Sequence, residues 1–385
     1  MIIINANAFL DAREFRMSDL IIEDGKIIRI LPAGSADPFE PEVINLQGAK
    51  LYPGFIDLQI NGCGGIIYND APTAEKISYM QEINSRSGTT TFLPTLVTTT
   101  AENIDFAIDE MRKFQDLHGR LGVPGIHIEG PFISPAKSGI HNKANIRRFT
   151  DEKLAQFTAA HRQIAMLTLS PEQFTIQQLE SLAASGITLS LGHTACSYEQ
   201  CIPLLGADKC IHNATHLYNA MSITASARTP GASDAVLDSG IYAGIIADLC
   251  HVHPALIRNA RRCLGNRLYL VTDALASAGA PADFKSFSFC GKTMYVKDEG
   301  FCADENGTLG GSSLTMNIGL RNLIESCGFS ENDSINMATV IPAQTVGLDD
   351  RLGSIAEGKE ANLTVLDSEY NCRLTVCHGE ILYRG

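Results

Sequence analysis

The sequence predicts an α/β protein, with a (β/α)8 barrel of the TIM type at its centre and a small β-sandwich domain formed by its two ends. Three observations favour this fold class. Apolar runs alternate with helix-like segments through the middle of the chain, both ends are rich in short β-like runs, and polar residues recur where the central runs end. A length of 385 residues suits one large domain with a smaller appendage. We expect residues 1–52 and 352–385 to form the small domain and residues 53–351 the barrel.

The two ends of the chain resemble each other in pattern. Their β-like runs are Met1–Asn5, Asp19–Glu23, Lys26–Leu31 and Glu42–Asn45 at the start, and Asn362–Asp367, Cys372–Cys377 and Glu380–Tyr383 at the end. Gly25 and Gly379 follow polar residues between such runs, as hairpin turns require. This pattern predicts one small sheet built from both termini.

The middle of the chain supplies eight candidate strands separated by helical patterns. The expected strands are Leu51–Ile60, Thr90–Leu96, Gly125–Ile128, Ala165–Leu169, Thr188–Leu191, Lys209–His212, Ala243–Ala247 and Leu268–Val271. The expected helices include Ala74–Ser87, Ala101–His118, Asp151–Arg162, Pro171–Ala184 and Pro254–Leu264. A doubly wound open sheet is the alternative, but the segment 61–65 lacks the G-x-G-x-x-G spacing and no P-loop is present.

Composition excludes several classes of protein. The formal net charge is −13 and no Lys/Arg run provides a basic face, which argues against nucleic-acid binding; an anionic small molecule would need a local positive pocket. The eleven cysteines form no C-x-x-C pair, and Cys210, Cys250 and Cys263 fall inside apolar stretches, so we expect buried, reduced thiols in a cytoplasmic protein. No signal peptide or apolar run of membrane-spanning length is evident.

Polar side chains follow six of the eight expected strands. They include Asp57, Gln59, Asn61, Glu129, His193, His216, Asp248, His251 and Asp273. Because the carboxyl ends of barrel strands meet at one rim, these residues are expected to converge there. Asp57 and His127 more naturally point inward as structural hydrogen-bonding groups.

Glu129, His193 and His216 together form the ligand set of a catalytic metal site with an open position. Each histidine taken alone is as readily a structural residue of the rim or core, with its hydrogen bonds made within the protein, as it is a metal ligand. Zinc fits this donor set best, but iron, cobalt and nickel accept the same donors. A divalent ion held there would lower the pKa of a water molecule. Asp273 is a candidate general acid and base, or else an N-cap, and His141 is either a loop residue reaching the substrate or an exposed histidine.

At these residues the sequence resembles the amidohydrolase superfamily and, within it, the N-acetylglucosamine-6-phosphate deacetylase family. The matching stretches are Pro53–Gly65, His127–Phe132, Gly192–Thr194, Ala214–Met221, Ile246–His251, Val271–Ala274, Gly307–Met316 and Leu352–Leu363. Many superfamily members carry H-x-H after the first strand for a second metal, whereas this chain has Gln59 and Asn61 there. Since amide oxygens are poor ligands for transition metals, we predict one tightly held metal ion per subunit.

The resemblance implies deacetylation of an amino-sugar phosphate, with Asp273 as acid and base and with His141 polarising the acetyl carbonyl. It also assigns the sugar and phosphate contacts to Ile140, Asn219, Ala220, His251 and the loop Leu309, Gly310 and Gly311. Arg228 would reach the phosphate from the neighbouring subunit of a homodimer.

Two alternatives stay open at this point. One is a dihydroorotase- or hydantoinase-type amide hydrolase, which usually needs a carboxylated lysine after strand four, where this chain has no lysine between Leu167 and Glu172. The other is a non-catalytic barrel scaffold.

Overall fold

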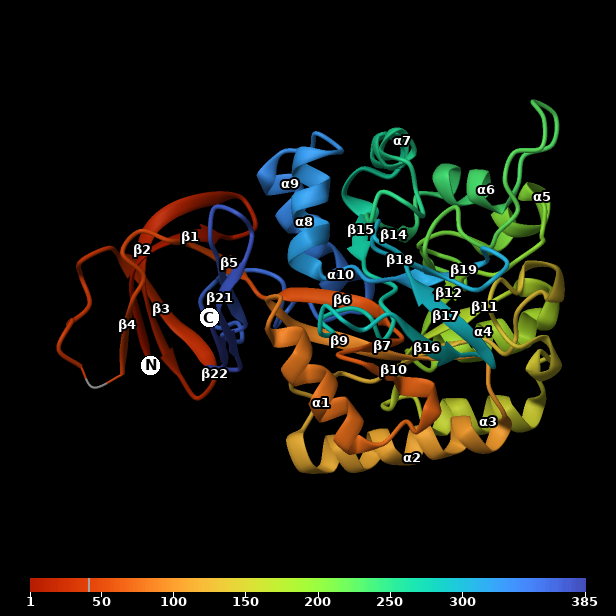
Figure 1. Cartoon of the computed structure of the whole chain (residues 1–385), viewed down its shortest axis with the longest axis horizontal. Helices are drawn as coiled ribbons and strands as arrows, with labels where there is room; N and C mark the ends of the chain where they lie inside the picture. The colour runs from red at the N-terminus through yellow and green to blue at the C-terminus, as the bar shows by residue number, and fades with distance from the viewer. Residues whose placement is uncertain (41) are drawn as a thin grey trace.

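The computed structural model describes residues 1–40 and 42–385. Its centre is a closed barrel of eight parallel strands in chain order (Figure 1). The strands are β6 (Phe55–Ile60), β9 (Thr89–Val97), β10 (Ile126–Glu129), β11 (Ile164–Leu169), β12 (Thr188–Leu191), β13 (Asn213–Ala214), β14 (Tyr242–Ile246) and β15 (Leu268–Val271). The Asp273 N–H donates to the Gln59 carbonyl at 3.0 Å, which joins the segment after β15 to β6 and closes the ring. The predicted (β/α)8 barrel is confirmed.

Helices cover the outside of the barrel. They are α1 (Ala74–Ser85), α2 (Ala101–His118), α3 (Asp151–Ala159), α4 (Ile176–Ala184), α5 (Tyr198–Cys201), α6 (Ala232–Ser239), α7 (Pro254–Leu264), α8 (Met316–Glu325), α9 (Glu331–Ala338) and α10 (Val340–Thr345). The side chains of Thr73, Thr100, Thr150 and Thr175 cap α1 to α4 by accepting a backbone N–H of the first turn. The expected helix from Pro171 begins later, because Pro171–Gln173 forms a separate 3-10 turn before the Thr175 cap.

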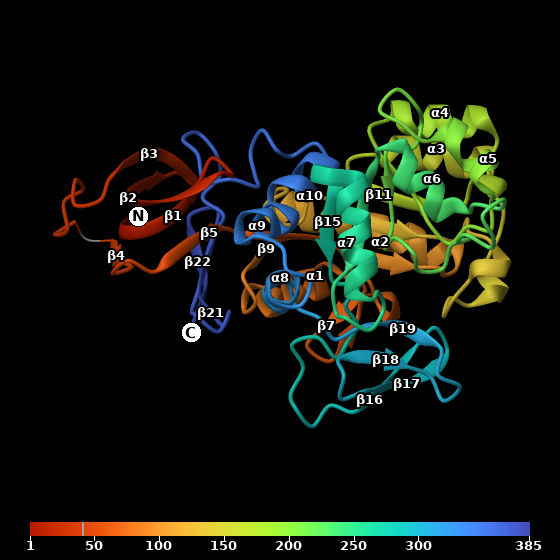
Figure 2. The same ribbon diagram turned by 90° about the horizontal axis from the view of Figure 1, so that it is seen from above.

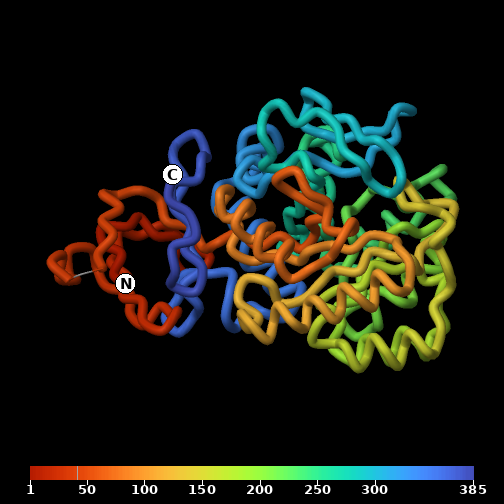
Figure 3. Tube along the Cα trace, turned by 60° about the horizontal axis from the view of Figure 1, so that its bottom comes forward, coloured from red at the N-terminus to blue at the C-terminus, as the bar shows by residue number. Residues whose placement is uncertain are grey.

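Both chain ends form one eight-stranded sheet, as predicted. Its strands are β1 (Ile2–Leu10), β2 (Glu14–Glu23), β3 (Lys26–Pro32), β4 (Val43–Asn45), β5 (Lys50–Pro53), β20 (Leu363–Leu366), β21 (Cys372–Cys377) and β22 (Glu380–Arg384). The two ends meet where β20 runs antiparallel to β5, with Leu363 opposite Pro53 and Val365 opposite Leu51. Figure 3 shows these red and blue segments side by side. The buried face of the sheet carries Ile3 and Leu20 among its apolar side chains.

Two strand predictions were wrong. The expected strand Leu51–Ile60 is divided at Gly54 between the terminal sheet and the barrel, and a Cβ at Gly54 would lie 2.2 Å from the Thr90 hydroxyl. The expected strand Lys209–His212 is not a strand: Lys209 and Cys210 form a bend after the turn at 207–208, and Ile211 makes only an isolated bridge to Leu205. The sixth barrel strand is instead the short β13, which begins at Asn213.

A four-stranded antiparallel sheet follows β15 and was not predicted. It consists of β16 (Ser286–Phe289), β17 (Lys292–Val296), β18 (Phe301–Ala303) and β19 (Leu309–Ser312). Figure 2 shows it as a separate layer on one side of the barrel. Phe289 and Met294 are buried in a small apolar cluster that also contains Ile140. Leu309, Gly310 and Gly311, expected in a loop, therefore lie in a strand.

The cysteines are only partly as expected. All eleven are free thiols, but Cys250 and Cys263 are exposed and Cys210 is half-buried, so the prediction that these three are buried was wrong. Among the described residues, no helix combines the length and the apolar character needed to cross a membrane.

Candidate metal centre and substrate cavity

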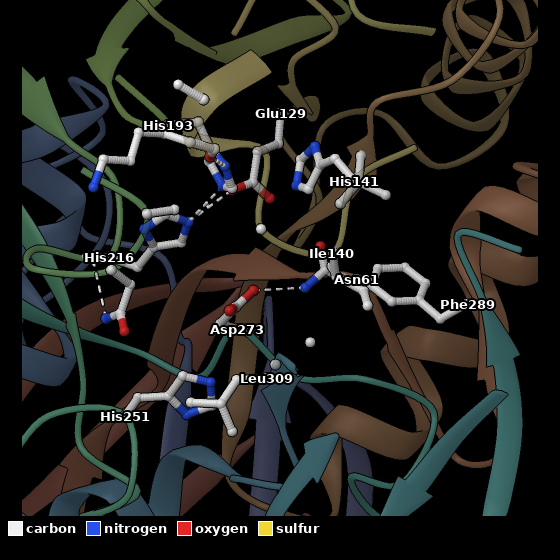
Figure 4. Close-up of a pocket in the computed structure, with 18 residues that line it drawn as sticks. Asn61, Glu129, Ile140, His141, His193, His216, His251, Asp273, Phe289 and Leu309 are labelled. Carbon is white, nitrogen blue, oxygen red and sulfur yellow. Dashed lines mark hydrogen bonds and ion pairs between the residues drawn. The ribbon is translucent and has the colours of Figure 1, made fainter. Parts of the chain in front are cut away.

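A cavity of about 390 Å³ opens at the carboxyl ends of the barrel strands. Glu129 is the last residue of β10, while His193, His216 and Asp273 lie just beyond β12, β13 and β15. All four side chains line the cavity, and Figure 4 shows them converging on it. The last three have φ of +47°, +30° and +49°, a left-handed conformation that is uncommon for residues other than glycine. The chain thus adopts an unfavourable backbone conformation at three positions that aim side chains into the cavity.

Glu129, His193 and His216 form a compact set of three buried ligand atoms. Glu129 Oε1 lies 3.1 Å from His193 Nε2 and 2.8 Å from His216 Nε2, and the two imidazole nitrogens are 3.2 Å apart. In the described part of the chain, this is the one group of three or more such residues whose ligand atoms lie within 4.8 Å of one another. The prediction that these three side chains meet is confirmed.

The hydrogen bonds around the set suit metal binding. The Lys137 carbonyl accepts from His193 Nδ1 at 2.8 Å, which fixes the ring so that Nε2 faces Glu129. Gln59 Nε2 donates to the other Glu129 oxygen at 3.2 Å. His216 Nδ1 is buried and has no hydrogen-bond partner among the described residues. One carboxylate and two imidazoles held in this way fit a divalent transition-metal ion.

The charges in the set are strongly coupled. Burial alone would raise the pKa of Glu129, but hydrogen bonds from His193 and His216 hold that pKa well below its usual range. Burial would lower the pKa of His216, whereas its hydrogen bond to Glu129 raises it. An ionised carboxylate beside two imidazoles is the state that binds a cation.

Asp273 lies next to this set and is held by two amides. Its Oδ1 accepts from Gln59 Nε2 at 3.1 Å and from Asn61 Nδ2 at 2.7 Å. Burial, together with the negative charge of Glu129, raises the pKa of Asp273 to about 7. No helix begins after Thr272, so Asp273 is not an N-cap. A carboxyl group with this environment can exchange a proton near neutral pH.

Two further histidines line the cavity. His141 Nδ1 lies 2.7 Å from the Thr98 hydroxyl, and burial lowers the pKa of His141 to about 3, so its ring is neutral. Its ring centroid is 4.4 Å from that of His193. His251 Nδ1 donates to Asp248 at 2.6 Å, and Asp248 also accepts the His251 backbone N–H, which fixes the ring.

The other predicted residues divide into three groups. The cavity wall includes Ile140, Asn219, Ala220, Leu309, Gly310 and Gly311. Arg228 does not line the cavity and is exposed on the loop between His216 and α6. Asp57 and His127 are buried structural residues, as expected: Asp57 binds Thr272, and His127 lies between the Leu58 carbonyl and the Thr168 hydroxyl.

Three features were missed from the sequence. Phe289 lines the cavity, and no pattern near it predicted the sheet that carries it. The roles of Gln59 and Asn61 as donors to Asp273 were also missed. Glu172 follows β11 and accepts from Thr194 Oγ1 at 3.0 Å and from Cys196 Sγ at 2.9 Å, directly after His193. The other candidate residues were selected because they follow barrel strands, and the same criterion would have selected Glu172.

Comparisons with known proteins find matches over nearly the whole chain. The model of the Amidohydrolase family matches residues 51–382. N-acetylglucosamine-6-phosphate deacetylase of Haemophilus influenzae is 40% identical over 94% of this chain and 93% of its own length. N-acetylgalactosamine-6-phosphate deacetylase of a Shewanella species is 36% identical over 88% of this chain and 85% of its own length. The crystal structure of N-acetylglucosamine-6-phosphate deacetylase from Pasteurella multocida superposes with a TM-score of 0.95 at 38% identity, covering 100% of this chain and 99% of that one.

Proposed function

The chain belongs to the amidohydrolase family, and from that premise we propose that it hydrolyses the N-acetyl group of N-acetylglucosamine 6-phosphate to give glucosamine 6-phosphate and acetate. The observation that carries this proposal is the buried carboxylate and two imidazoles beside Asp273 in one cavity. Relatives that cover nearly the whole chain bear the same activity in their names, which supports the choice of substrate.

Glu129, His193 and His216 would hold one divalent ion, with zinc as the proposed metal. When bound, the ion supplies a positive charge that polarises the acetyl carbonyl and lowers the pKa of the attacking water. This donor set fits zinc because all three donors are nitrogen or carboxylate oxygen and a fourth position stays open for water or substrate.

Asp273 moves the proton in both halves of the reaction. Its Oδ1 is occupied by the Gln59 and Asn61 amides, so the other carboxylate oxygen takes the proton from water as the water attacks the acetyl carbon. The carbon–nitrogen bond then breaks, its electron pair stays on nitrogen, and Asp273 returns the proton to that nitrogen. The neutral His141 ring donates a hydrogen bond to the developing oxyanion through Nε2, since Nδ1 is held by Thr98.

The remaining cavity residues would bind the sugar phosphate. Ile140 and residues 309–311 of β19 line the cavity and would contact the sugar, while Asn219, Ala220 and His251 line it as well and would offer polar groups to the sugar phosphate. We further propose that the protein is a homodimer in which Arg228 of one subunit reaches the phosphate in the other. An exposed guanidinium suits this role because it binds phosphate bidentately and offsets the acidic character of the chain.

Two further expectations belong to this proposal. The first is that residues 1–52 and 352–385 form the small domain and residues 53–351 the catalytic barrel. The second is that the protein is cytoplasmic, which the free thiols of all eleven cysteines suit. A dihydroorotase-type activity is disfavoured because no lysine follows β11. Glu172 lies there instead, and its carboxylate binds the loop after His193. A non-catalytic scaffold would have no need for an acid and base beside three ligands.

Acetate release tests the proposal. Purified protein is assayed with N-acetylglucosamine 6-phosphate, with the 6-phosphate of N-acetylgalactosamine and with unphosphorylated N-acetylglucosamine, each before and after chelation. We expect metal-dependent release that is fastest with the first sugar. Equal rates with phosphorylated and unphosphorylated sugars would refute the phosphate site, and full activity after verified metal removal would refute the metal site.

A further inference from the structure

We propose that Asn61 accepts a hydrogen bond from the N–H of the substrate's acetamido group and thereby orients the leaving nitrogen toward Asp273. This inference rests on the proposed deacetylase function and assigns Asn61 a direct contact with substrate. It concerns the amide oxygen of Asn61, which no described residue satisfies.

The Asn61 side chain is buried, but one of its two polar atoms has no partner. Only 1% of the residue is exposed, and it lines the cavity beside Asp273. Its Nδ2 donates to Asp273 Oδ1 at 2.7 Å, whereas its Oδ1 is a buried acceptor without a hydrogen bond from the described protein. Figure 4 shows the nitrogen joined to Asp273 and the oxygen turned away from it. A buried acceptor without a hydrogen bond destabilises the folded protein unless a bound molecule donates one to it.

The orientation of the Asn61 amide is determined by its neighbours. An ionised carboxylate can only accept, so the NH₂ group must face Asp273 and the oxygen must face the other way. The backbone is held as well, because Asn61 N–H donates to the Ala274 carbonyl at 2.8 Å and Asn61 O accepts from Tyr68 N–H at 2.9 Å. Asn61 therefore presents a fixed acceptor one hydrogen bond away from the proposed acid.

The chemistry selects the acetamido N–H as the matching donor. When Asp273 protonates the leaving nitrogen, that nitrogen must lie within hydrogen-bond distance of Asp273 and therefore close to Asn61. The proton must arrive on the nitrogen lone pair, which forms as the amide loses its planarity. An N–H bond held by Asn61 Oδ1 leaves that lone pair free to point toward Asp273, so one side chain positions both the acid and the group it protonates.

The decisive experiment compares two substrates that differ only in this donor. One is N-acetylglucosamine 6-phosphate, and the other is the 6-phosphate of 2-O-acetylglucose, in which an ester oxygen replaces the N–H. Each is hydrolysed by the wild type, by Asn61→Ala and by Asn61→Val, and kcat and KM are determined at equal metal content. Asn61→Val fills the same space if Asn61→Ala proves unstable.

Gln59→Ala is the matched control. Gln59 donates to the same Asp273 oxygen at 3.1 Å and to Glu129 Oε2 at 3.2 Å, but it does not line the cavity. Its loss therefore disturbs both carboxylates without removing an acceptor for substrate, and the comparison at equal metal content separates the two effects. We expect both Asn61 variants to lose about 10- to 100-fold more kcat/KM on the amide than on the ester. Gln59→Ala is expected to reduce kcat/KM on the amide and on the ester by the same factor.

The outcomes separate this inference from the function it rests on. Equal losses on amide and ester in the Asn61 variants would overturn the contact with the acetamido N–H, even though the enzyme is a deacetylase. A wild type that releases acetate from neither substrate would instead overturn the proposed function. A second readout needs no turnover: metal-free wild-type protein should bind the amide more tightly than the ester, and Asn61→Val should remove that preference.

Discussion

Replacing Asp273 by asparagine should abolish proton transfer while leaving the metal site intact. The Gln59 and Asn61 amides both donate to Asp273 Oδ1, so an asparagine must turn its oxygen toward them to keep these two bonds. Its NH₂ group then occupies the place of the free carboxylate oxygen, where it cannot accept a proton. Asp273 is not among the three clustered ligand atoms, so metal binding is retained.

The size of the loss follows from the two proton transfers that Asp273 performs. General acid or base catalysis contributes typically about 10²–10⁴-fold, so we expect kcat to fall at least about 10³-fold in Asp273→Asn. Steady-state acetate release measures kcat, and metal analysis on the same sample measures the bound metal. Activity within tenfold of wild type, with metal bound, would refute the assignment of Asp273.

The pH profile gives a second check on the same residue. Burial and the charge of Glu129 raise the pKa of Asp273 to about 7, and a bound cation would lower it again. A protonated Asp273 cannot act as base, so kcat/KM should fall as the pH decreases through a value at or below about 7. In metal-free protein the raised pKa means that the folded state holds a proton that the unfolded state has released. Stability should therefore decrease as the pH rises toward about 7, and this dependence should be weaker in Asp273→Asn.

Three further predictions concern the supports of the site. Glu172→Gln should weaken metal binding roughly 10- to 100-fold in a chelator competition, because Glu172 holds the segment after His193, whereas the exposed Glu199→Gln should not. Arg228→Ala should raise KM for the phosphorylated sugar only, and mixing it with the inactive Asp273→Asn subunits should restore the wild-type KM. A mixture whose KM stays raised argues against a shared site. Phe132→Ala should reduce the free energy of unfolding by about 3–5 kcal/mol, since Phe132 is 1% exposed and its ring lies 4.7 Å from that of Phe149; a loss below 1 kcal/mol in denaturant titration would contradict this packing argument.

The sequence was sufficient to predict the barrel and the meeting of its three ligand residues. Glu129, His193 and His216 each follow an apolar run, and the closure of parallel strands brings such positions to one rim whatever the details of the helices. The expected helix over Ala101–His118 matched at both ends because Thr100 supplies a clear cap and Gly119 a clear stop.

The remaining features depend on contacts between distant residues. The Lys137 carbonyl that orients His193 belongs to a loop, and no local pattern ties that loop to β12. The β16–β19 sheet consists of short, half-exposed strands whose burial comes from packing on Ile140 and Leu275, so its apolar signal is weak. Asn61 was considered only as a replacement for a metal ligand, since its hydrogen bond to Asp273 exists only once β15 closes on β6.

The pairing of β5 with β20 has a consequence for how the protein is made. Residues 50–53 leave the ribosome early, but their partner at residues 363–366 is among the last segments to be synthesised. Until then β5 presents an unpaired strand edge, a known starting point for aggregation. The amino-terminal sheet can therefore be completed only after almost the entire chain has been synthesised. A truncation that removes only the last two dozen or so residues would leave the edge of β5 permanently unpaired.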